Sequence, residues 1–99
     1  GDLAPLVLAQ KRLLDAAAMR TAVGGRLVYC VCSLEPEEGE AQIADFLSGH
    51  PNFEIEPVAP GEGGAPPASV TAQGTLRILP THLEDGLDGF FAARLVRKG

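Results

Sequence analysis

A short apolar run bounded by turn-forming residues constrains the fold of this 99-residue chain more than any other feature. Residues 26–32 read RLVYCVC, a run rich in β-branched types that does not alternate between apolar and polar side chains. Gly24 and Gly25 precede the run, and the segment SLEP follows it. Such a run is typical of a strand buried on both faces, as in a sheet covered by helices. The sequence therefore predicts a layered α/β fold.

Helical patterns flank this strand. Leu and Ala dominate residues 4–20, where Asp2 could cap a helix and Pro5 falls in its first turn. The polar stripe of this helix is narrow, so we expect it to be covered on most sides. A second helix is predicted to begin near Pro36, because the glutamates around it suit the positive end of a helix dipole. Its expected inner face comprises Ile43, Phe46 and Leu47, and its outer face Glu38, Gln42 and Asp45.

Three further strands are predicted after the second helix. Residues 53–58 alternate in polarity, and residues 75–80 and 90–98 are short apolar runs. The helix–strand–helix–strand order favours parallel strands, and the short connection between the last two strands favours a closing antiparallel pair. Residues 59–74 are rich in Gly and Pro and predict a mobile loop. Residues 1–99 are thus expected to form a single partial domain.

Charge and composition narrow the classes of function. The formal net charge is −5, so the chain repels phosphate at long range, and if it serves an RNA enzyme, most of the basic surface must lie elsewhere. Cys30 and Cys32 fall on one side of a strand, where a disulfide would oppose the extended geometry. Free thiols suit a reducing compartment. Since no signal-peptide pattern and no membrane-spanning apolar run is present, we expect a soluble cytoplasmic protein without a membrane partner.

Cys32 is the principal candidate for chemistry. It ends the predicted strand, and ligands of open α/β sheets bind beyond the carboxyl ends of the strands. The following helix N-terminus would lower its pKa and the nearby glutamates would raise it, so the sequence leaves the direction open. Two other interpretations remain: both cysteines are small core residues, or Cys30 and Cys32 bind a metal with His50 and His82.

Four further groups allow both a functional and a structural interpretation. They are the acidic run 35–40, His82 with Asp85 and Asp88, Phe90 with Phe91, and the basic set Arg94, Arg97 and Lys98. The acidic run suits a metal or a charged helical turn, and the histidine suits acid–base chemistry or an ordinary surface site. The phenylalanines suit base stacking or the core, and at least one should be buried because adjacent strand residues face opposite ways. The basic set suits phosphate or solvent.

Several of these segments together resemble a known family. Residues 24–47, GGRLVYCVCSLEPEEGEAQIADFL, are similar to a segment of the bacterial 16S rRNA cytosine-5 methyltransferase B, or Sun-type, family, in which GG-x-LVYSTCS precedes a Pro-Glu-Glu-rich helix start. QKRLLDAAA resembles the helix before that strand, and DGLDGFFAARL resembles the closing strand. The resemblance covers nearly the whole chain except residues 59–74.

The resemblance implies the C-terminal half of a Rossmann-like class I methyltransferase domain, with parallel strands and a closing antiparallel pair. In this family Cys32 corresponds to the nucleophilic cysteine of a Thr-Cys-Ser box, with Val31 in place of the threonine and Cys30 in place of a serine. The resemblance also implies S-adenosylmethionine as the cofactor and rRNA as the partner of the parent protein. The cofactor-binding loop is expected to be absent from this chain, which is therefore expected to be inactive alone.

A competing hypothesis is a non-catalytic α/β interaction module that binds a partner through an exposed sheet edge. The acidic charge and the missing cofactor half motivate it. Under either hypothesis the first strand is expected to lack its natural neighbour, and an unpaired edge favours a homodimer or strand exchange.

Overall fold

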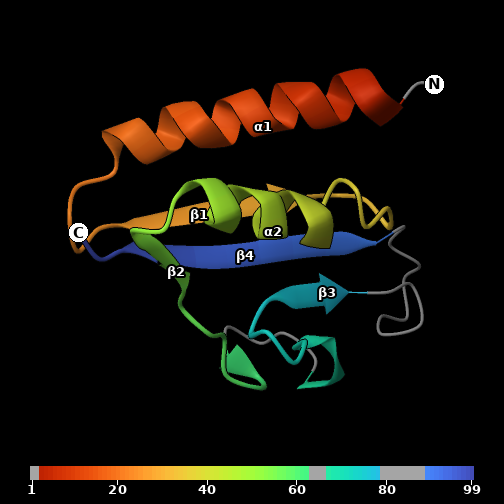
Figure 1. The fold of residues 1–99 in the computed structure, drawn as a ribbon. Helices are drawn as coiled ribbons and strands as arrows, with labels where there is room; N and C mark the ends of the chain where they lie inside the picture. Colours follow the sequence, from red (N-terminus) through yellow and green to blue (C-terminus); the bar gives the residue numbers. More distant parts are fainter. Residues whose placement is uncertain (1–2, 63–66, 79–88) are drawn as a thin grey trace.

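The computed structural model describes residues 3–62, 67–78 and 89–99, which form two helices packed on a four-stranded sheet (Figure 1). In chain order the elements are α1 (Leu3–Arg20), β1 (Arg26–Val31), α2 (Glu40–Gly49), β2 (Phe53–Ile55), the 3-10 turn η2 (Pro67–Ser69), β3 (Leu76–Ile78) and β4 (Phe90–Arg97). The predicted α/β class and the predicted order of helices and strands are confirmed. The helical cap expected at Asp2 lies outside the described residues.

β4 organises the sheet, because each of the other described strands pairs with it in the antiparallel direction. β1 lies along one side of β4, while β2 and β3 share the other side, β2 near the C-terminal end of β4 and β3 near its N-terminal end. The expected antiparallel closing pair of β3 and β4 is confirmed. β1 and β2 run in the same direction as predicted, but β4 is inserted between them, so they do not pair directly.

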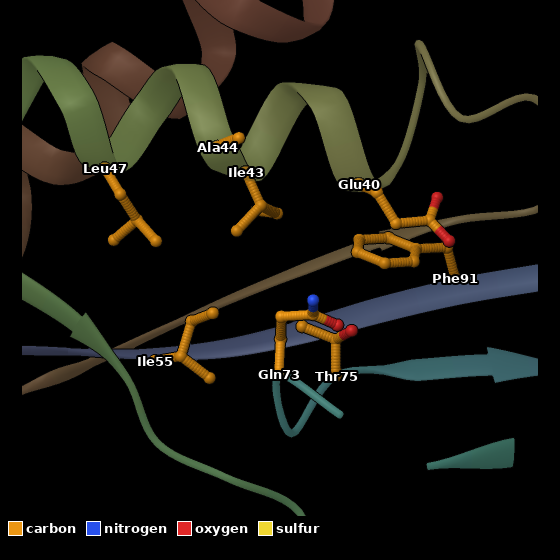
Figure 2. Close-up of a pocket in the computed structure, with 8 residues that line it drawn as sticks. All are labelled: Glu40, Ile43, Ala44, Leu47, Ile55, Gln73, Thr75 and Phe91. Atoms are coloured by element: carbon orange, nitrogen blue, oxygen red, sulfur yellow. The ribbon is translucent and has the colours of Figure 1, made fainter. Parts of the chain in front are cut away.

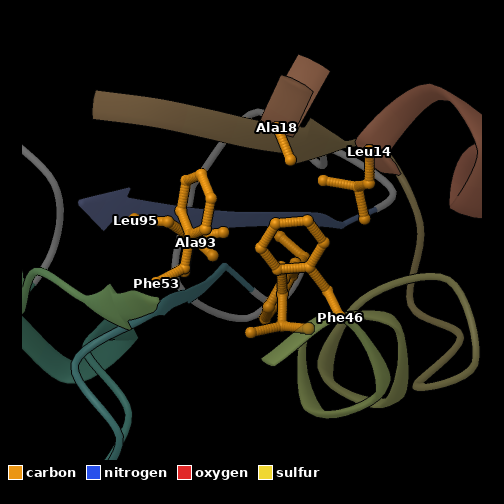
Figure 3. Close-up of a cluster of buried hydrophobic side chains, with 8 residues drawn as sticks. Leu14, Ala18, Phe46, Phe53, Ala93 and Leu95 are labelled. Atoms are coloured by element: carbon orange, nitrogen blue, oxygen red, sulfur yellow. The ribbon is translucent and has the colours of Figure 1, made fainter. Parts of the chain in front are cut away.

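The buried core lies between β4 and the two helices (Figure 3). Alternate residues of β4 face the helices, as the pleat of a strand requires. The core comprises Leu14, Ala18, Ile43, Phe46, Phe53, Phe91, Ala93 and Leu95. Phe91 is fully buried and Phe90 only partly, which confirms that at least one of the pair belongs to the core.

The prediction that the first strand is buried on both faces is wrong for the described part of the chain. Exposure alternates along β1, and the side chain of Val28 is 58% exposed on the face away from the helices. α1 is also less covered than expected, since Leu13 is 70% exposed and Met19 is 85% exposed. Such apolar residues suit a sheet that is covered on both faces, whereas the described residues place helices on one face only (Figure 1).

α2 begins later than predicted. Residues 36–39 form turns in place of the first helical turn, with the Glu38 N–H donating to the Glu35 carbonyl oxygen at 3.0 Å. The expected inner residues Ile43 and Phe46 are buried. Helical periodicity predicted the position of α2 but not its first residue. Contacts with strands that are distant in the sequence hold the turns before α2, and local periodicity does not report such contacts.

Glu38 and Gln42, expected on the outer face of the second helix, are buried instead. The Gln42 amide nitrogen donates to the Val7 carbonyl oxygen at 2.6 Å and to Gln10 Oε1 at 3.3 Å. Gln10 in turn donates to Glu38 Oε1 at 3.3 Å. α1 packs against this side of α2, so a polar stripe that would suit solvent forms a hydrogen-bonded contact between helices.

The strands after α2 are shorter than predicted. Residues 79–80 lie outside the described part of the chain, and so do residues 63–66 of the loop predicted to be mobile. The described remainder of that loop contains η2 and an isolated bridge between Val70 and Leu76. Neither described helix has the length and apolar character that crossing a membrane requires.

Candidate active site

Cys32 lies one residue beyond the end of β1 and is exposed. Cys30 is also free and exposed, so the interpretation of both cysteines as core residues is wrong. Partial burial on the sheet raises the pKa of the Cys30 thiol, and the neighbouring Cys32 adds to this shift. The candidate nucleophile is therefore a thiol accessible from solvent at the carboxyl end of an edge strand.

Hydrogen bonds fix the connection from Cys32 to α2 at several points. Arg77 Nη1 donates to the Ser33 carbonyl oxygen, and the Glu35 N–H donates to Ser33 Oγ at 3.0 Å. The Tyr29 hydroxyl donates to the Glu38 carbonyl oxygen at 2.5 Å. Burial, followed by the charge of Glu38, raises the pKa of Tyr29 to about 12. The loop beside the thiol is thus attached to both β1 and β3.

Arg77 is a residue of this site that the sequence interpretation missed. Its guanidinium binds Glu40, with Nε 3.0 Å from Oε2 and Nη2 2.5 Å from Oε1, and its side chain is only 12% exposed. It also lies over the Phe91 ring, 5.1 Å from the centroid. The hydrogen bond from Arg77 holds the pKa of Glu40 below its usual value. The available signal was a lone charged residue in the short apolar run 75–80.

Two glycines allow the loop to pack closely. A Cβ on Gly39 would lie 2.6 Å from Arg77 Nη2 and 2.8 Å from Phe91 Cγ. A Cβ on Gly89 would lie 2.5 Å from Leu34 Cδ2. Larger residues would therefore displace the loop or the side chains beneath it.

The described residues give no support for a metal site. Glu40 is paired with Arg77, and no three His, Cys, Asp or Glu side chains in the described ranges lie close enough to bind an ion. His50 stacks on Phe46 at 4.1 Å between centroids, and its Nδ1 lies 2.9 Å from the Phe46 carbonyl oxygen. The other predicted ligand, His82, lies outside the described residues together with Asp85 and Asp88.

The basic residues predicted near the end of the last strand have protein partners. Arg94 Nη1 lies 2.6 Å from Glu62 Oε2, and Arg97 Nη1 donates to the Thr21 carbonyl oxygen at 2.7 Å. Lys98 lies 4.0 Å from Glu54. Carboxylates thus partly balance the charges of Arg94 and Lys98, whereas the partner of Arg97 is a backbone carbonyl.

An apolar cavity of about 330 Å³ lies between α2 and the side of the sheet that carries β2 and β3 (Figure 2). Its lining comprises Glu40, Ile43, Ala44, Leu47, Ile55, Gln73, Thr75 and Phe91. Cys32 does not line it, so the cavity is not the place where a substrate would meet the thiol.

S-adenosylmethionine, the cofactor implied by the family resemblance, does not fit the described residues. Its ribose hydroxyls and amino group call for acidic partners, and among the described residues that line the cavity the only carboxylate, that of Glu40, is occupied by Arg77. Gly39, the glycine after β1, has Arg77 and Phe91 on its open side and leaves no space for a ligand. The described residues alone do not form a site for this cofactor.

Comparison with known proteins gives a consistent family. The sequence model of the 16S rRNA methyltransferase RsmB/F family matches residues 1–96. Ribosomal RNA small subunit methyltransferase B of Thermus thermophilus is 43% identical over 98 residues, which cover 97% of this chain and 22% of that protein. A probable methyltransferase B from Synechocystis is 43% identical over 93 residues, covering 94% of this chain and 20% of that protein.

A solved structure shares the fold. The crystal structure of a methyltransferase homologue from Pyrococcus horikoshii has a TM-score of 0.77 and 31% identity, over 99% of this chain and 32% of that one. The chain spans about a fifth of the length of the two curated relatives. On the match to residues 1–96, the chain belongs to the 16S rRNA methyltransferase RsmB/F family.

Proposed function

We propose that residues 1–99 are part of the catalytic domain of an S-adenosylmethionine-dependent RNA cytosine-5 methyltransferase, with Cys32 as its nucleophile and rRNA as its substrate. The exposure of Cys32 directly after β1 is the observation that supports this role most strongly. The family match and the names of the relatives support methylation of rRNA. A reducing cytoplasmic compartment suits the two free thiols.

The proposed chemistry requires a thiolate because carbon 5 of cytosine is a poor nucleophile. The sulfur electron pair of Cys32 forms a bond to carbon 6, and the electrons of the carbon 5–carbon 6 double bond make carbon 5 nucleophilic. S-adenosylmethionine bound by other parts of the protein would supply a methyl group to carbon 5; its methyl–sulfur bond would break with the electron pair left on sulfur, and S-adenosylhomocysteine would be the leaving group. A base removes the proton from carbon 5, the sulfur–carbon bond breaks, and the thiolate is released. The target base must leave its stack to reach the sulfur.

The surface around Cys32 is consistent with a domain completed by further protein. Val28 and Cys30 are exposed on the uncovered face of β1, and β1 forms an edge of the sheet within the described residues. The residues present do not form a cofactor site. We therefore propose that the isolated chain is inactive and that a longer polypeptide supplies the cofactor site and most of the RNA-binding surface.

The test uses a chimera in which residues 1–99 replace the matching segment of the Thermus thermophilus relative. The chimera is incubated with S-adenosylmethionine and 16S rRNA containing 5-fluorocytidine, whose fluorine blocks the final elimination and traps the covalent adduct. We expect a protein–RNA adduct on denaturing gels. Cys32→Ser should abolish the adduct, because the hydroxyl is a far weaker nucleophile at neutral pH.

Cys30→Ala is the matched control, since Cys30 is also a free, exposed thiol and lies two residues before Cys32, on β1. It should leave the adduct intact. Thermal melting checks that each variant is folded. An adduct that persists in Cys32→Ser, or a folded chimera that forms none while the unaltered Thermus protein does, contradicts the proposed function. The second result is the one that a non-catalytic interaction module predicts.

A further inference from the structure

We propose that Arg77 is a positioning residue that fixes the backbone beside Cys32 and so sets the direction of the thiol. The structural half of this inference depends only on the contacts of Arg77. Its consequence for chemistry rests on the proposed function of Cys32.

The register of the sheet puts Arg77 in the same row as the residue before Cys32. Val31 on β1 and Arg77 on β3 both pair with Phe91, from opposite sides of β4. Residues paired across antiparallel strands share a face, so Arg77 emerges on the side of the sheet where Phe91 meets the helices. Its guanidinium then passes over the Phe91 ring, at 5.1 Å from the centroid.

From there Arg77 binds both ends of the connection between β1 and α2. Nη1 donates to the Ser33 carbonyl oxygen at the start of this connection. Nε and Nη2 bind the carboxylate of Glu40, the first residue of α2. This two-point pairing fixes the plane of the guanidinium, so its third contact has a defined direction.

The guanidinium has little freedom to leave this position. Its side chain is only 12% exposed, and Gly39 and Phe91 enclose it closely enough that a Cβ on Gly39 would lie 2.6 Å from Nη2. The carbonyl that it holds belongs to the residue directly after Cys32. Arg77 therefore restricts the backbone that carries the thiol before any substrate arrives, and such preorganisation accelerates reactions that need a precise approach.

The test compares Arg77→Gln, Arg77→Lys and Glu40→Gln with Arg94→Gln. Arg94 is a matched control because it also pairs with a carboxylate, at 2.6 Å from Glu62, while the hydrogen bonds and ion pairs of its side chain within the described ranges go to residues 56–62 and not to residues 32–40. Hydrogen exchange of peptides spanning residues 32–39 reports the order of the loop without requiring activity. In the chimera, the rate of adduct formation at saturating RNA and the dissociation constant for RNA report the chemistry separately.

Arg77→Gln should accelerate exchange in residues 32–39 and slow adduct formation on the order of tenfold to a hundredfold, with RNA affinity unchanged. Glu40→Gln should have a smaller effect of the same kind. Arg77→Lys should recover only part of the rate, because one ammonium cannot make the forked contact. Arg94→Gln should change neither the hydrogen exchange of residues 32–39 nor the rate of adduct formation.

Unchanged exchange in Arg77→Gln overturns the positioning role, whatever the chemistry. Faster exchange with an unchanged adduct rate overturns its catalytic consequence, and so does an equal loss of rate in Arg94→Gln. Failure of the proposed function is a separate result, namely an adduct that persists in Cys32→Ser or a folded chimera that forms no adduct. In that case the exchange measurement still decides whether Arg77 orders the loop.

Discussion

At the scale of single residues, Gly39 shows how tightly the loop beside the thiol is packed. Arg77 and the Phe91 ring occupy the space that any side chain at this position would need. The constraint that these contacts place on residue 39 is therefore one of space.

We predict that Gly39→Ala lowers the free energy of unfolding by about 1–3 kcal/mol, the usual range for overpacking a close contact. Gly49→Ala is the matched control, because nothing lies within 4 Å of its Cβ position at the end of α2. That substitution should be neutral or stabilising by up to about 1 kcal/mol. Urea denaturation followed by circular dichroism measures both. An equal response of the two variants would show that Gly39 is not tightly enclosed.

Tyr29 provides a spectroscopic test of the same loop, since it is the only tyrosine of the chain. Its pKa is raised from 10.0 to about 12, so the folded state holds the phenolic proton more tightly than the unfolded state. Its contribution to stability is complete below pH 10 and is lost as the pH rises from about 10 to about 12.

We predict that tyrosinate absorbance of the folded chain titrates well above that of the urea-unfolded chain. In Tyr29→Phe, the free energy of unfolding should be lower at neutral pH, because the Glu38 carbonyl oxygen loses its donor. The variant should also show a smaller fall in stability between pH 10 and 12 than the wild type. Coinciding titration curves of the folded and unfolded chains would contradict the buried hydroxyl contact.

The sequence predicted that Cys32 follows a strand, but it did not predict the contacts that hold the backbone beside this residue. Its place after an apolar strand can be derived from local sequence, whereas the contact of Arg77 with Ser33 links residues far apart in the chain. Burial of Glu38 and Gln42 likewise depends on where α1 lies. Local periodicity carries no information about these long-range contacts. The sequence could therefore identify the candidate nucleophile but not the residues that position it.

At the scale of elements, the polar contact between α1 and α2 is a specific feature of this fold. Gln42 is 3% exposed and donates to a backbone carbonyl of α1, that of Val7, at 2.6 Å. A backbone carbonyl inside a helix has a partner already, so this bond uses its second lone pair and fixes the helices relative to each other.

We predict that Gln42→Ala destabilises the chain by about 1–3 kcal/mol, because it leaves a small cavity and removes the donor to Gln10 Oε1 and to the Val7 carbonyl oxygen. Ser48→Ala, at an exposed position of the same helix, should change stability by no more than about 0.5 kcal/mol. Thermal and urea denaturation of both variants check this. Similar values for the two would argue against a buried polar contact.

The elements themselves were largely predictable, because helices and strands follow local patterns of apolar residues. Their pairing was not. The short connection before β4 correctly indicated an antiparallel pair with β3, but nothing in the local pattern indicated that β4 also separates β1 from β2. The position of β4 between β1 and β2 depends on packing across the whole sheet, which short stretches of sequence do not determine.

At the scale of the whole molecule, apolar residues are exposed on the surfaces that the described elements do not cover. They include Leu13, Met19, Val23 and Val28. β1 is also an edge strand within the described residues, and such edges pair readily with other strands.

We predict that the isolated chain self-associates as its concentration rises, which sedimentation equilibrium would detect. Val28→Lys, which adds a charge to the exposed face of β1, should weaken association without unfolding the chain. Val23→Lys alters an equally exposed valine outside the strand and should have less effect. A monomer at all concentrations, or equal effects of both substitutions, would contradict association through β1.

The dependence of three strands on β4 has a consequence for biosynthesis. Each of them has its only described strand partner in β4, which is translated after all three. A nascent chain therefore exposes β1, β2 and β3 without partners until that segment has left the ribosome, and gains the sheet in one late step. Premature termination before Phe90 would remove β4 and so leave β1, β2 and β3 without the strand partner that they share.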